Sequence, residues 1–295
     1  GRSTLGCRSG PLYRHRTFPW RDHHPFVQRH MHMLSYDGTI GFRSTAAACI
    51  SLLSNHVVQG RVIFPAAGYL EVARAAASTA LHGVFFLQPL AAEALGLLIE
   101  CAVSDGRFEV RSGEADAVEA ARTVHCSGAA AGGDAWQRVD HASVRAPSRL
   151  VDVGALYDGF DTVGLQYGPG YRTLVRAWGG ARSALARLRA RSTHEGTQVH
   201  PADLDDALCT SAAMASSGGG ETRLPFAVDD ALLHGAPGEL WAVRSCKHQA
   251  LSNAQCLITL ALCSLVCRLW RAKEPRRSRC GLGLPRDSRK RSLTG

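Results

Sequence analysis

A histidine near one proline and an aspartate near another have the side-chain types needed for acid–base chemistry in this 295-residue chain. His56 begins the stretch HVVQGRVIFP, in which Gly60 follows after four residues and Pro65 after five more. A neutral imidazole, with an ordinary pKa of about 6.5, can accept a proton near pH 7. A strand that becomes a helix at Pro65 would leave free N–H groups and the positive end of a helix dipole nearby. Such an end stabilises developing negative charge, for example on a thioester oxygen, and Gly60 would allow close backbone approach. The alternative is a histidine without a catalytic role, buried in the core with its hydrogen-bonding groups paired.

Three aspartates, Asp203, Asp205 and Asp206, follow Pro201 in the stretch HPADLDDALC. Acids in the first turns of a helix complement its dipole by about 0.3–1 kcal/mol each, which explains their presence without selecting one of them. Asp205 and Cys209 are four residues apart and would share one helix face. A buried carboxyl facing an apolar tunnel would have a raised pKa and could donate a proton to a leaving hydroxyl.

A third candidate is the tight turn QYGPGY, which contains Tyr167, Gly168 and Pro169. A tyrosine in such a turn can orient a carboxyl group or a substrate oxygen. Other catalytic signatures are missing from the sequence: it has no GxSxG, no Walker A loop, no GxGxxG and no HExxH. None of the ten cysteines forms a CxxC pair, which argues against structural zinc.

The elements that must position these residues form two similar blocks. The alternation of apolar and polar residues predicts strands at 39–44, 56–64, 95–104, 107–112 and 121–128, around a helix at 65–80 that begins with a proline. A second block has a short helix at 153–164, a turn at 167–172, strands near 173–178 and 183–191, and a proline-initiated helix at 200–214. This pattern indicates one structural unit that occurs twice, and we expect two α+β halves packed side by side.

The net charge of +9 is concentrated at the C-terminal end. Residues 244–295 hold 12 of the 34 Lys and Arg and 2 of the 25 Asp and Glu, so this tail carries +10 and the other residues together carry −1. We expect this tail to be solvated and not to recognise nucleic acid specifically. Binding of a membrane or of nucleic acid through the tail is the weakest hypothesis. The N-terminal segment has no apolar core of a signal peptide, so a cytoplasmic protein with reduced thiols is expected.

The motifs above resemble those of the dehydratase domains of modular, type I polyketide synthases. HVVQGRVIFP matches the HxxxGxxxxP motif of that family in full, GLQYGPGYRTL resembles its YGP motif, and HPADLDDALC resembles its HPxxLDxxxQ segment. HPFV at 24–27 and LPFAVDD at 224–230 extend the resemblance, which covers roughly residues 23–243.

This resemblance implies a double hot-dog fold, with two sheets that each wrap around a central helix. It implies dehydration of a β-hydroxyacyl thioester carried on the phosphopantetheine arm of an acyl carrier protein, without a metal or a bound cofactor. His56 would remove the α-proton, and Asp205 would protonate the departing β-hydroxyl. Tyr167, in the turn with Gly168 and Pro169, would help to place the substrate. The segment from Gly60 to Pro65 would hold the thioester carbonyl.

The implied partners are the acyl carrier protein and neighbouring polyketide synthase domains, with a homodimer left open and no nucleic acid. The expected organisation is a linker at 1–22, an N-terminal hot-dog half at 23–144, a linker at 145–152, a C-terminal half at 153–243 and the basic tail at 244–295.

Two departures from the family pattern suggest impaired activity. Cys209 stands where the family has Gln or His, and a thiol is a weak hydrogen-bonding partner for orienting Asp205. The tail shows no alternating pattern, so the C-terminal half is expected to lack strands, and its apolar run at 256–267 suggests an interfacial or buried helix. A catalytically silent acyl-thioester-binding or dimerisation module and a product-template-like domain therefore remain alternatives.

Overall fold

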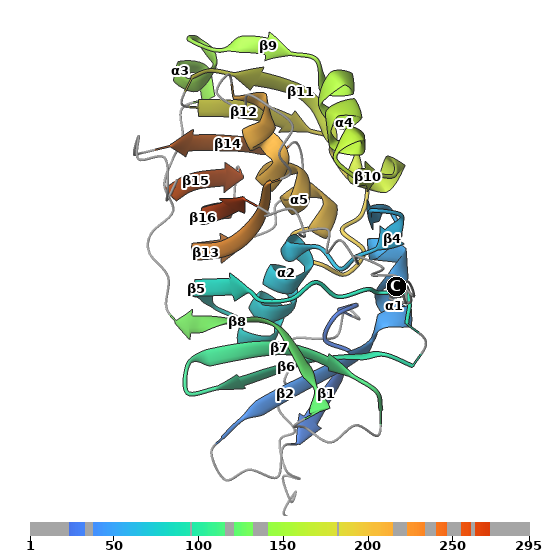
Figure 1. Ribbon diagram of the computed structural model, residues 1–295. Helices are drawn as coiled ribbons and strands as arrows, with labels where there is room; N and C mark the ends of the chain where they lie inside the picture. The colour runs from blue at the N-terminus through green and yellow to red at the C-terminus, as the bar shows by residue number, and fades with distance from the viewer. Residues whose placement is uncertain are drawn as a thin grey trace, which may run out of the picture.

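The computed structural model describes residues 24–32, 38–94, 96–115, 121–131, 141–181, 183–214, 223–233, 240–246, 255–260 and 263–271. The linker predicted for residues 1–22 lies outside this part of the chain. One 13-stranded sheet runs through both halves of the molecule, in the order β1-β2-β6-β7-β8-β5-β13-β16-β15-β14-β12-β11-β9. A second sheet has the three strands β10-β3-β4 and lies at one side of the first (Figure 1).

The N-terminal half of the large sheet accompanies helix α2 (Ala66–Ala77). Its strands are antiparallel, as expected for elements joined by short turns. They are β1 (Arg29–His32), β2 (Ile40–Thr45), β6 (Leu98–Ser104), β7 (Arg107–Gly113), β8 (Thr123–Ala131) and β5 (Ala80–Phe86).

The C-terminal half accompanies helix α5 (Pro201–Cys209). Its strands are β13 (Arg223–Leu233), β16 (Cys263–Arg271), β15 (Gln255–Leu260), β14 (Trp241–Cys246), β12 (Ser183–Leu188), β11 (Leu174–Gly179) and β9 (Arg149–Val151). This half also contains α3 (His141–Arg145), α4 (Val153–Thr162) and two 3₁₀ turns, η2 (Pro169–Tyr171) and η3 (Thr210–Ala213).

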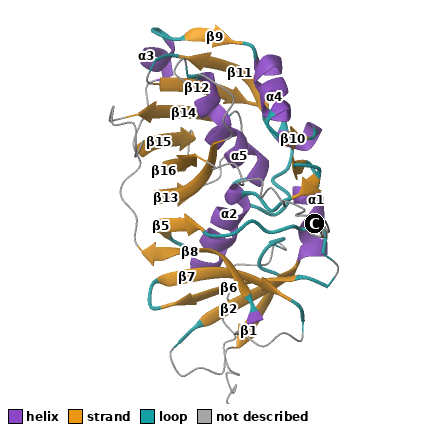
Figure 2. Ribbon diagram, in the orientation of Figure 1, coloured by secondary structure: helices purple, strands orange, loops and turns teal. Residues whose placement is uncertain are grey.

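Strands β5 and β13 form the seam between the two halves, with Val84 opposite Val228 in their antiparallel register. Helices α2 and α5 contact each other on one side of this seam, and Figure 2 shows them following one another along the same face of the sheet. This is the α+β, double hot-dog arrangement that the sequence predicts. Residues from the two halves therefore meet along the β5–β13 seam, where α2 contacts α5, and in the pairing of β3 with β10.

Helix α2 begins where its sequence predicts. Pro65 is its N-cap residue, in an extended conformation at φ −72° and ψ 152°. Gly68 in the first turn lies under Phe64, and a Cβ at Gly68 would come within 2.6 Å of that ring, so only glycine fits there. The helix ends at Ser78, whose backbone is left-handed at φ 56° and whose N–H bonds to the carbonyl of Arg74 at 2.7 Å.

Helix α5 is buried along almost its whole length, from Pro201 to Leu208. Its N-cap is His200, whose Nδ1 accepts a hydrogen bond from the N–H of Ala202 at 3.2 Å. Because a neutral ring that accepts at Nδ1 must carry its proton on Nε2, this bond sets the tautomer of His200. Burial lowers the pKa of His200 to about 3, which keeps the ring neutral.

Several sequence predictions are wrong at the ends of elements. The segment predicted as one strand at 56–64 is a hairpin of β3 (His56–Val58) and β4 (Arg61–Val62). The predicted helix at 65–80 stops at Ala77, and Ala80 already belongs to strand β5. Helix α1 (Ala46–Leu53), which Thr45 caps by accepting from the N–H of Ala48, was not predicted.

The C-terminal tail contributes to the sheet. Strands β15 and β16 lie between β13 and β14 in the sheet. The predicted helix at 256–267 is therefore wrong, and so is the prediction that the C-terminal half lacks strands. Strand β14 crosses the boundary predicted at 243, and β9 lies within the segment predicted as the linker 145–152. The large sheet therefore continues from β13 to β9 without an internal gap.

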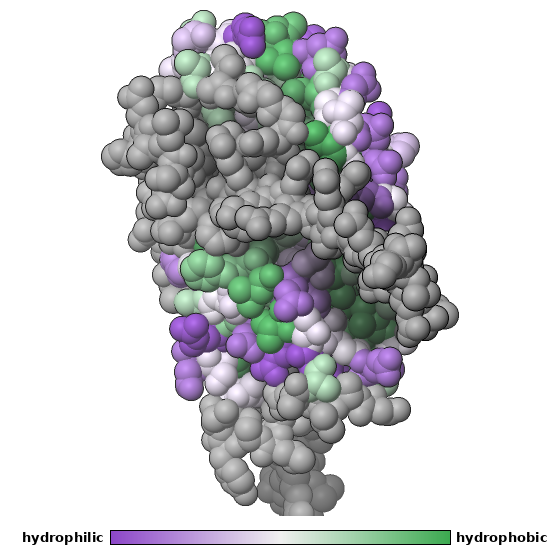
Figure 3. Space-filling view, in the orientation of Figure 1, coloured by the Kyte–Doolittle hydropathy of each residue, from purple (hydrophilic) through white to green (hydrophobic). Residues whose placement is uncertain are grey.

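The surface in the view of Figure 3 shows hydrophobic area near the middle of the molecule, where β5 and β8 lie, bordered by hydrophilic residues. Phe85 and Leu87, at the end of β5 and just beyond it, are 44% and 54% exposed. None of the helices in the described ranges has both the length and the hydropathy needed to cross a membrane.

Candidate functional site

The three-stranded sheet places a histidine and a tyrosine opposite one another. In the antiparallel pairing of β10 (Leu165–Tyr167) with β3, Tyr167 is the register partner of His56. Their ring centroids are 5.5 Å apart. The pairing therefore brings two of the predicted site residues together, although each comes from a different half of the chain.

The imidazole of His56 is held by one hydrogen bond. Its Nδ1 lies 2.7 Å from the carbonyl oxygen of Ile63. Because a carbonyl can only accept, we assign the proton of the neutral ring to Nδ1, which leaves a lone pair on Nε2. Ile63 stands two residues before Pro65, so this bond also places the start of α2 beside the imidazole. In this tautomer, Nε2 is the ring atom of His56 that can accept a proton.

That accepting atom points towards α5. Nε2 of His56 lies 3.7 Å from Oδ2 of Asp205, and each side chain is only 9% exposed. Burial raises the pKa of the Asp205 carboxyl, and the charge of His56 and a hydrogen bond from Tyr167 offset part of that rise. Oδ2 accepts no hydrogen bond from any residue that the structure describes. A raised pKa and an unengaged oxygen suit a group that donates a proton.

The other two aspartates of α5 are engaged elsewhere. Asp203 is fully buried, and its Oδ2 accepts from Nε of Arg191 at 2.7 Å. Asp206 Oδ2 accepts from the Tyr157 hydroxyl at 2.9 Å and from the N–H and hydroxyl of Thr173 at 2.5 and 2.6 Å. These contacts tie α5 to α4 and to the start of β11. Asp205 is therefore the aspartate that lies beside His56, which spacing alone did not indicate, and its role as the acid stays a prediction.

Cys209 lies one turn after Asp205, as its spacing predicts. Its Sγ is 3.4 Å from the hydroxyl of Tyr167. Burial, followed by the charge of Asp205, raises the pKa of Tyr167, so the phenol stays protonated. Tyr167 and Cys209 thus form part of the wall around the catalytic candidates.

Gly60 lies in the turn between β3 and β4. Gln59 and Gly60 have φ values of 51° and 77°, as the two central residues of a type I′ hairpin require. Nothing lies within 4 Å of the position that a Cβ on Gly60 would take. Its N–H donates to Oε1 of Gln166 at 2.8 Å. Gly60 therefore shapes the hairpin that carries His56, and its binding of substrate stays a prediction.

Gly168 is fixed by close packing. Its N–H donates to the carbonyl of Asn55 at 2.8 Å, and a Cβ on Gly168 would collide with the Asn55 side chain. The next residue, Pro169, begins η2. Asn55 was not predicted as a site residue, although its position directly before His56 was the available signal. It links the YGP turn to the strand that carries the base.

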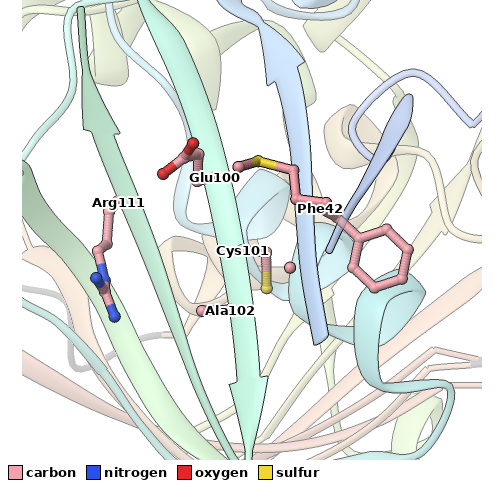
Figure 4. Close-up of a pocket in the computed structure, with 7 residues that line it drawn as sticks. Phe42, Glu100, Cys101, Ala102 and Arg111 are labelled. Carbon is pink, nitrogen blue, oxygen red and sulfur yellow. The ribbon is translucent and has the colours of Figure 1, made fainter. Parts of the chain in front are cut away.

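No group of three or more His, Cys, Asp or Glu side chains is arranged to hold a metal ion in the described part of the chain. The pocket in Figure 4 is lined by residues of β1, β2, β6 and β7, and none of the predicted site residues is among them. Its Glu100 already pairs with Arg43 and Arg122. This pocket is therefore separate from the His56–Asp205 site.

Comparisons with known proteins agree with the arrangement. The sequence model of the polyketide synthase dehydratase domain family matches residues 24–125. That of the polyketide synthase dehydratase N-terminal domain family matches residues 137–259. The chain is 32% identical over 213 residues to polyketide synthase ThaG of Burkholderia thailandensis, covering 65% of this chain and 4% of that protein. It is 30% identical over 202 residues to erythronolide synthase EryA2 of Saccharopolyspora erythraea, covering 62% and 6%.

The chain thus spans only a small part of the curated relatives that it matches. Among solved structures, the dehydratase domain from the CurF module of curacin polyketide synthase has a TM-score of 0.73 and 21% identity. That match covers 84% of this chain and 99% of the other.

Proposed function

The chain belongs to the family of polyketide synthase dehydratase domains. We therefore propose that His56 and Asp205 together remove water from a β-hydroxyacyl thioester. The product is the α,β-enoyl thioester, which makes the domain a hydro-lyase of polyketide biosynthesis. The observation that carries this proposal is the 3.7 Å separation of His56 Nε2 from Asp205 Oδ2, between two buried side chains from opposite halves of the chain. Groups this close can act on adjacent carbon atoms of one ligand.

The chemical step uses both groups at once or in sequence. Nε2 of His56 takes the proton from Cα, and the electrons of that C–H bond form the Cα=Cβ double bond. The Cβ–O bond breaks, and its oxygen takes the carboxyl proton of Asp205 to leave as water. The step ends with a protonated His56 and an ionised Asp205, and transfer of the proton from one to the other restores the starting state.

The start of α2 supports the charge that develops on the thioester oxygen. Pro65, as the N-cap, leaves the first N–H groups of a 12-residue helix at the end nearest His56. The positive end of the helix dipole favours negative charge at that point. We place the thioester carbonyl at this end, with Gly60 acting through the shape of its hairpin.

Substrate placement falls to the YGP turn and to Cys209. Tyr167 offsets the raised pKa of Asp205 through a hydrogen bond and contacts Cys209, so its hydroxyl borders the space beside the acid. Gly168 and Pro169 set the position of this tyrosine relative to His56. A thiol at Cys209 orients its neighbours less firmly than an amide would, which suits a reduced rate rather than an abolished one.

The partners in this proposal follow from the family. The substrate is carried on the phosphopantetheine arm of an acyl carrier protein, and the domain works beside other domains of a polyketide synthase. The relatives named above are polyketide synthases of which the matched region is a small part. The proposed chemistry uses the side chains of the site and requires no bound cofactor, and a homodimer is compatible with it.

The test is incubation with a β-hydroxyacyl pantetheine thioester, followed by the absorbance of the conjugated enoyl thioester. We expect turnover by the native protein and none by the His56→Phe variant. Saturable binding without turnover by the native protein would instead support a silent acyl-thioester-binding module. Cyclisation of a polyketone chain would indicate a product-template-like domain.

A further inference from the structure

The hydroxyl of Tyr171 is a buried donor that the described residues leave unused. The side chain is 2% exposed, and its hydroxyl has no hydrogen-bond partner in the part of the chain that the structure describes. Leaving a buried hydroxyl without a partner costs about 1–3 kcal/mol, so such a group calls for an explanation. A ligand oxygen that binds at this point would satisfy it.

Tyr171 lies against the catalytic candidates. Its ring centroid is 5.3 Å from that of His56, and it stacks on Tyr167 with centroids 6.3 Å apart and planes 11° from parallel. Among the nearby charges, Asp205 acts most strongly on its hydroxyl, followed by Arg191. Tyr171 therefore lies against His56, on a turn that packs against α5, the helix that carries Asp205.

The position of Tyr171 is fixed by its own turn. Its N–H donates to the carbonyl of Gly168 at 2.9 Å, and Gly168 is in turn bonded to Asn55. The residue closes η2, which packs against α5. A donor held in this way needs no rearrangement before it meets a substrate oxygen. Burial also raises the pKa of the phenol, so it keeps its proton.

We propose that Tyr171 donates a hydrogen bond to the β-oxygen of the substrate, beside the proton that Asp205 delivers to the same atom. This inference rests on the proposed dehydration and adds a second ligand for the departing hydroxyl. The bond stabilises the negative charge that gathers on that oxygen as the Cβ–O bond lengthens. Tyr171 keeps its own proton throughout, so the balance of the step is unchanged. Tyr171 is then a catalytic residue that the sequence motif alone did not single out.

The Tyr171→Phe variant tests the proposal because it removes only the hydroxyl and keeps the stacked ring. We expect kcat/KM for a β-hydroxyacyl pantetheine thioester to fall by about 10- to 100-fold, the range for a hydrogen bond to a charged oxygen. The melting temperature should stay the same or rise, because an unsatisfied buried group has been removed. A structural role would instead lower the melting temperature.

Tyr69→Phe is the matched control. Tyr69 is also buried, at 3% exposure, and its hydroxyl likewise lacks a hydrogen-bond partner within the described ranges. Its ring stacks on His125 in the N-terminal half, with ring centroids 6.1 Å apart. The same deletion should therefore leave kcat/KM unchanged. Equal activity of Tyr171→Phe and the native protein would overturn the proposal.

Binding separates this inference from the function on which it rests. In a His56→Phe background, the further change Tyr171→Phe should weaken binding of a β-hydroxyacyl pantetheine thioester by about 10-fold. It should leave the affinity for the acyl thioester without the β-oxygen unchanged. Equal effects on both ligands would contradict a bond to the β-oxygen. Absence of turnover by the native protein would overturn the dehydratase mechanism, whereas the contrast between the two ligands would still decide the role of Tyr171.

Discussion

Gly168 packs directly on Asn55, the residue that precedes His56, and its N–H donates to the Asn55 carbonyl at 2.8 Å. This contact joins the turn that carries Tyr167 to the strand that carries the base. The Gly168→Ala change would drive a Cβ into the Asn55 side chain. We expect turnover to fall at least 10-fold and the unfolding free energy to fall by about 1–3 kcal/mol.

Gly159→Ala is the control for that variant. Gly159 lies exposed within α4, and a Cβ there would meet nothing within 4 Å. Replacing an exposed helix glycine by alanine stabilises by roughly 0.5–1 kcal/mol and should not change turnover. If Gly168→Ala behaved like Gly159→Ala in both denaturant unfolding and turnover, the contact with Asn55 would not position the site.

Asp206 makes stability depend on pH. Burial raises the pKa of its carboxyl to about 7, whereas an aspartate in an unfolded chain has a pKa of about 3.9. Between these values the folded protein binds a proton that the unfolded chain has lost. The contribution of this group to stability is therefore lost as pH rises from about 4 to about 7.

The Asp206→Asn variant removes this titration and keeps an oxygen that can accept from Tyr157 and Thr173. We expect the unfolding free energy of the variant, relative to that of the native protein, to be higher at pH 8 than at pH 5 by on the order of 1–3 kcal/mol, measured by urea unfolding. A difference in unfolding free energy that is the same at both pH values would rule out a raised pKa at Asp206.

Glu71 links the two halves from inside α2. It is fully buried and accepts from Arg74 at 2.8 and 3.0 Å and from the N–H of Gln198 at 2.7 Å. Removing one partner of a buried ion pair costs about 3–5 kcal/mol, so Glu71→Gln should lower the unfolding free energy by roughly that amount. The control is Glu109→Gln, because Glu109 is 46% exposed and its pair with Arg111 is expected to contribute about 0–1 kcal/mol. Similar losses in the two variants would show that Glu71 is not a structural link.

Replacing Cys209 provides a test in which kcat is expected to rise. Its thiol is a weak partner for the Tyr167 hydroxyl at 3.4 Å, and a glutamine amide offers a stronger one. We expect Cys209→Gln to raise kcat several-fold and Cys209→Ala to change it little. An unchanged or lower kcat in Cys209→Gln, measured with the same thioester, would mean that the thiol does not limit the rate.

The sequence predicted the parts of this site that depend on local patterns. The histidine, the proline that starts each central helix and the tyrosine of the turn all follow from short stretches of residues. The choice of Asp205 over Asp203 and Asp206 depended on the resemblance, because spacing alone places all three in one helical turn. Only the packing of α5 shows that two of the three are already bonded to Arg191, Tyr157 and Thr173.

The errors in the fold have physical causes too. The alanine-rich sequence that begins in α2 continues to Ala80, beyond the end of the helix at Ala77. It therefore gave no sign of the left-handed backbone at Ser78, the C-cap residue. The positive φ of Gln59 is unusual for a residue other than glycine, so the hairpin could not be read from the sequence. Strands β15 and β16 lack the alternation of a half-exposed strand, and periodicity alone does not distinguish a short apolar strand from a buried helix.

The most direct test of the account is the rate of enoyl thioester formation in a series of aspartate variants of α5. Asp205→Asn should abolish turnover without changing the melting temperature by more than a few degrees, because Asp205 Oδ2 accepts no hydrogen bond from the described residues. Asp203→Asn and Asp206→Asn should retain measurable turnover at temperatures where they are folded, because neither carboxyl faces His56. An Asp205→Asn variant that keeps the native rate, or an Asp206→Asn variant that is folded and inactive while Asp205→Asn is active, would contradict the pairing of His56 with Asp205.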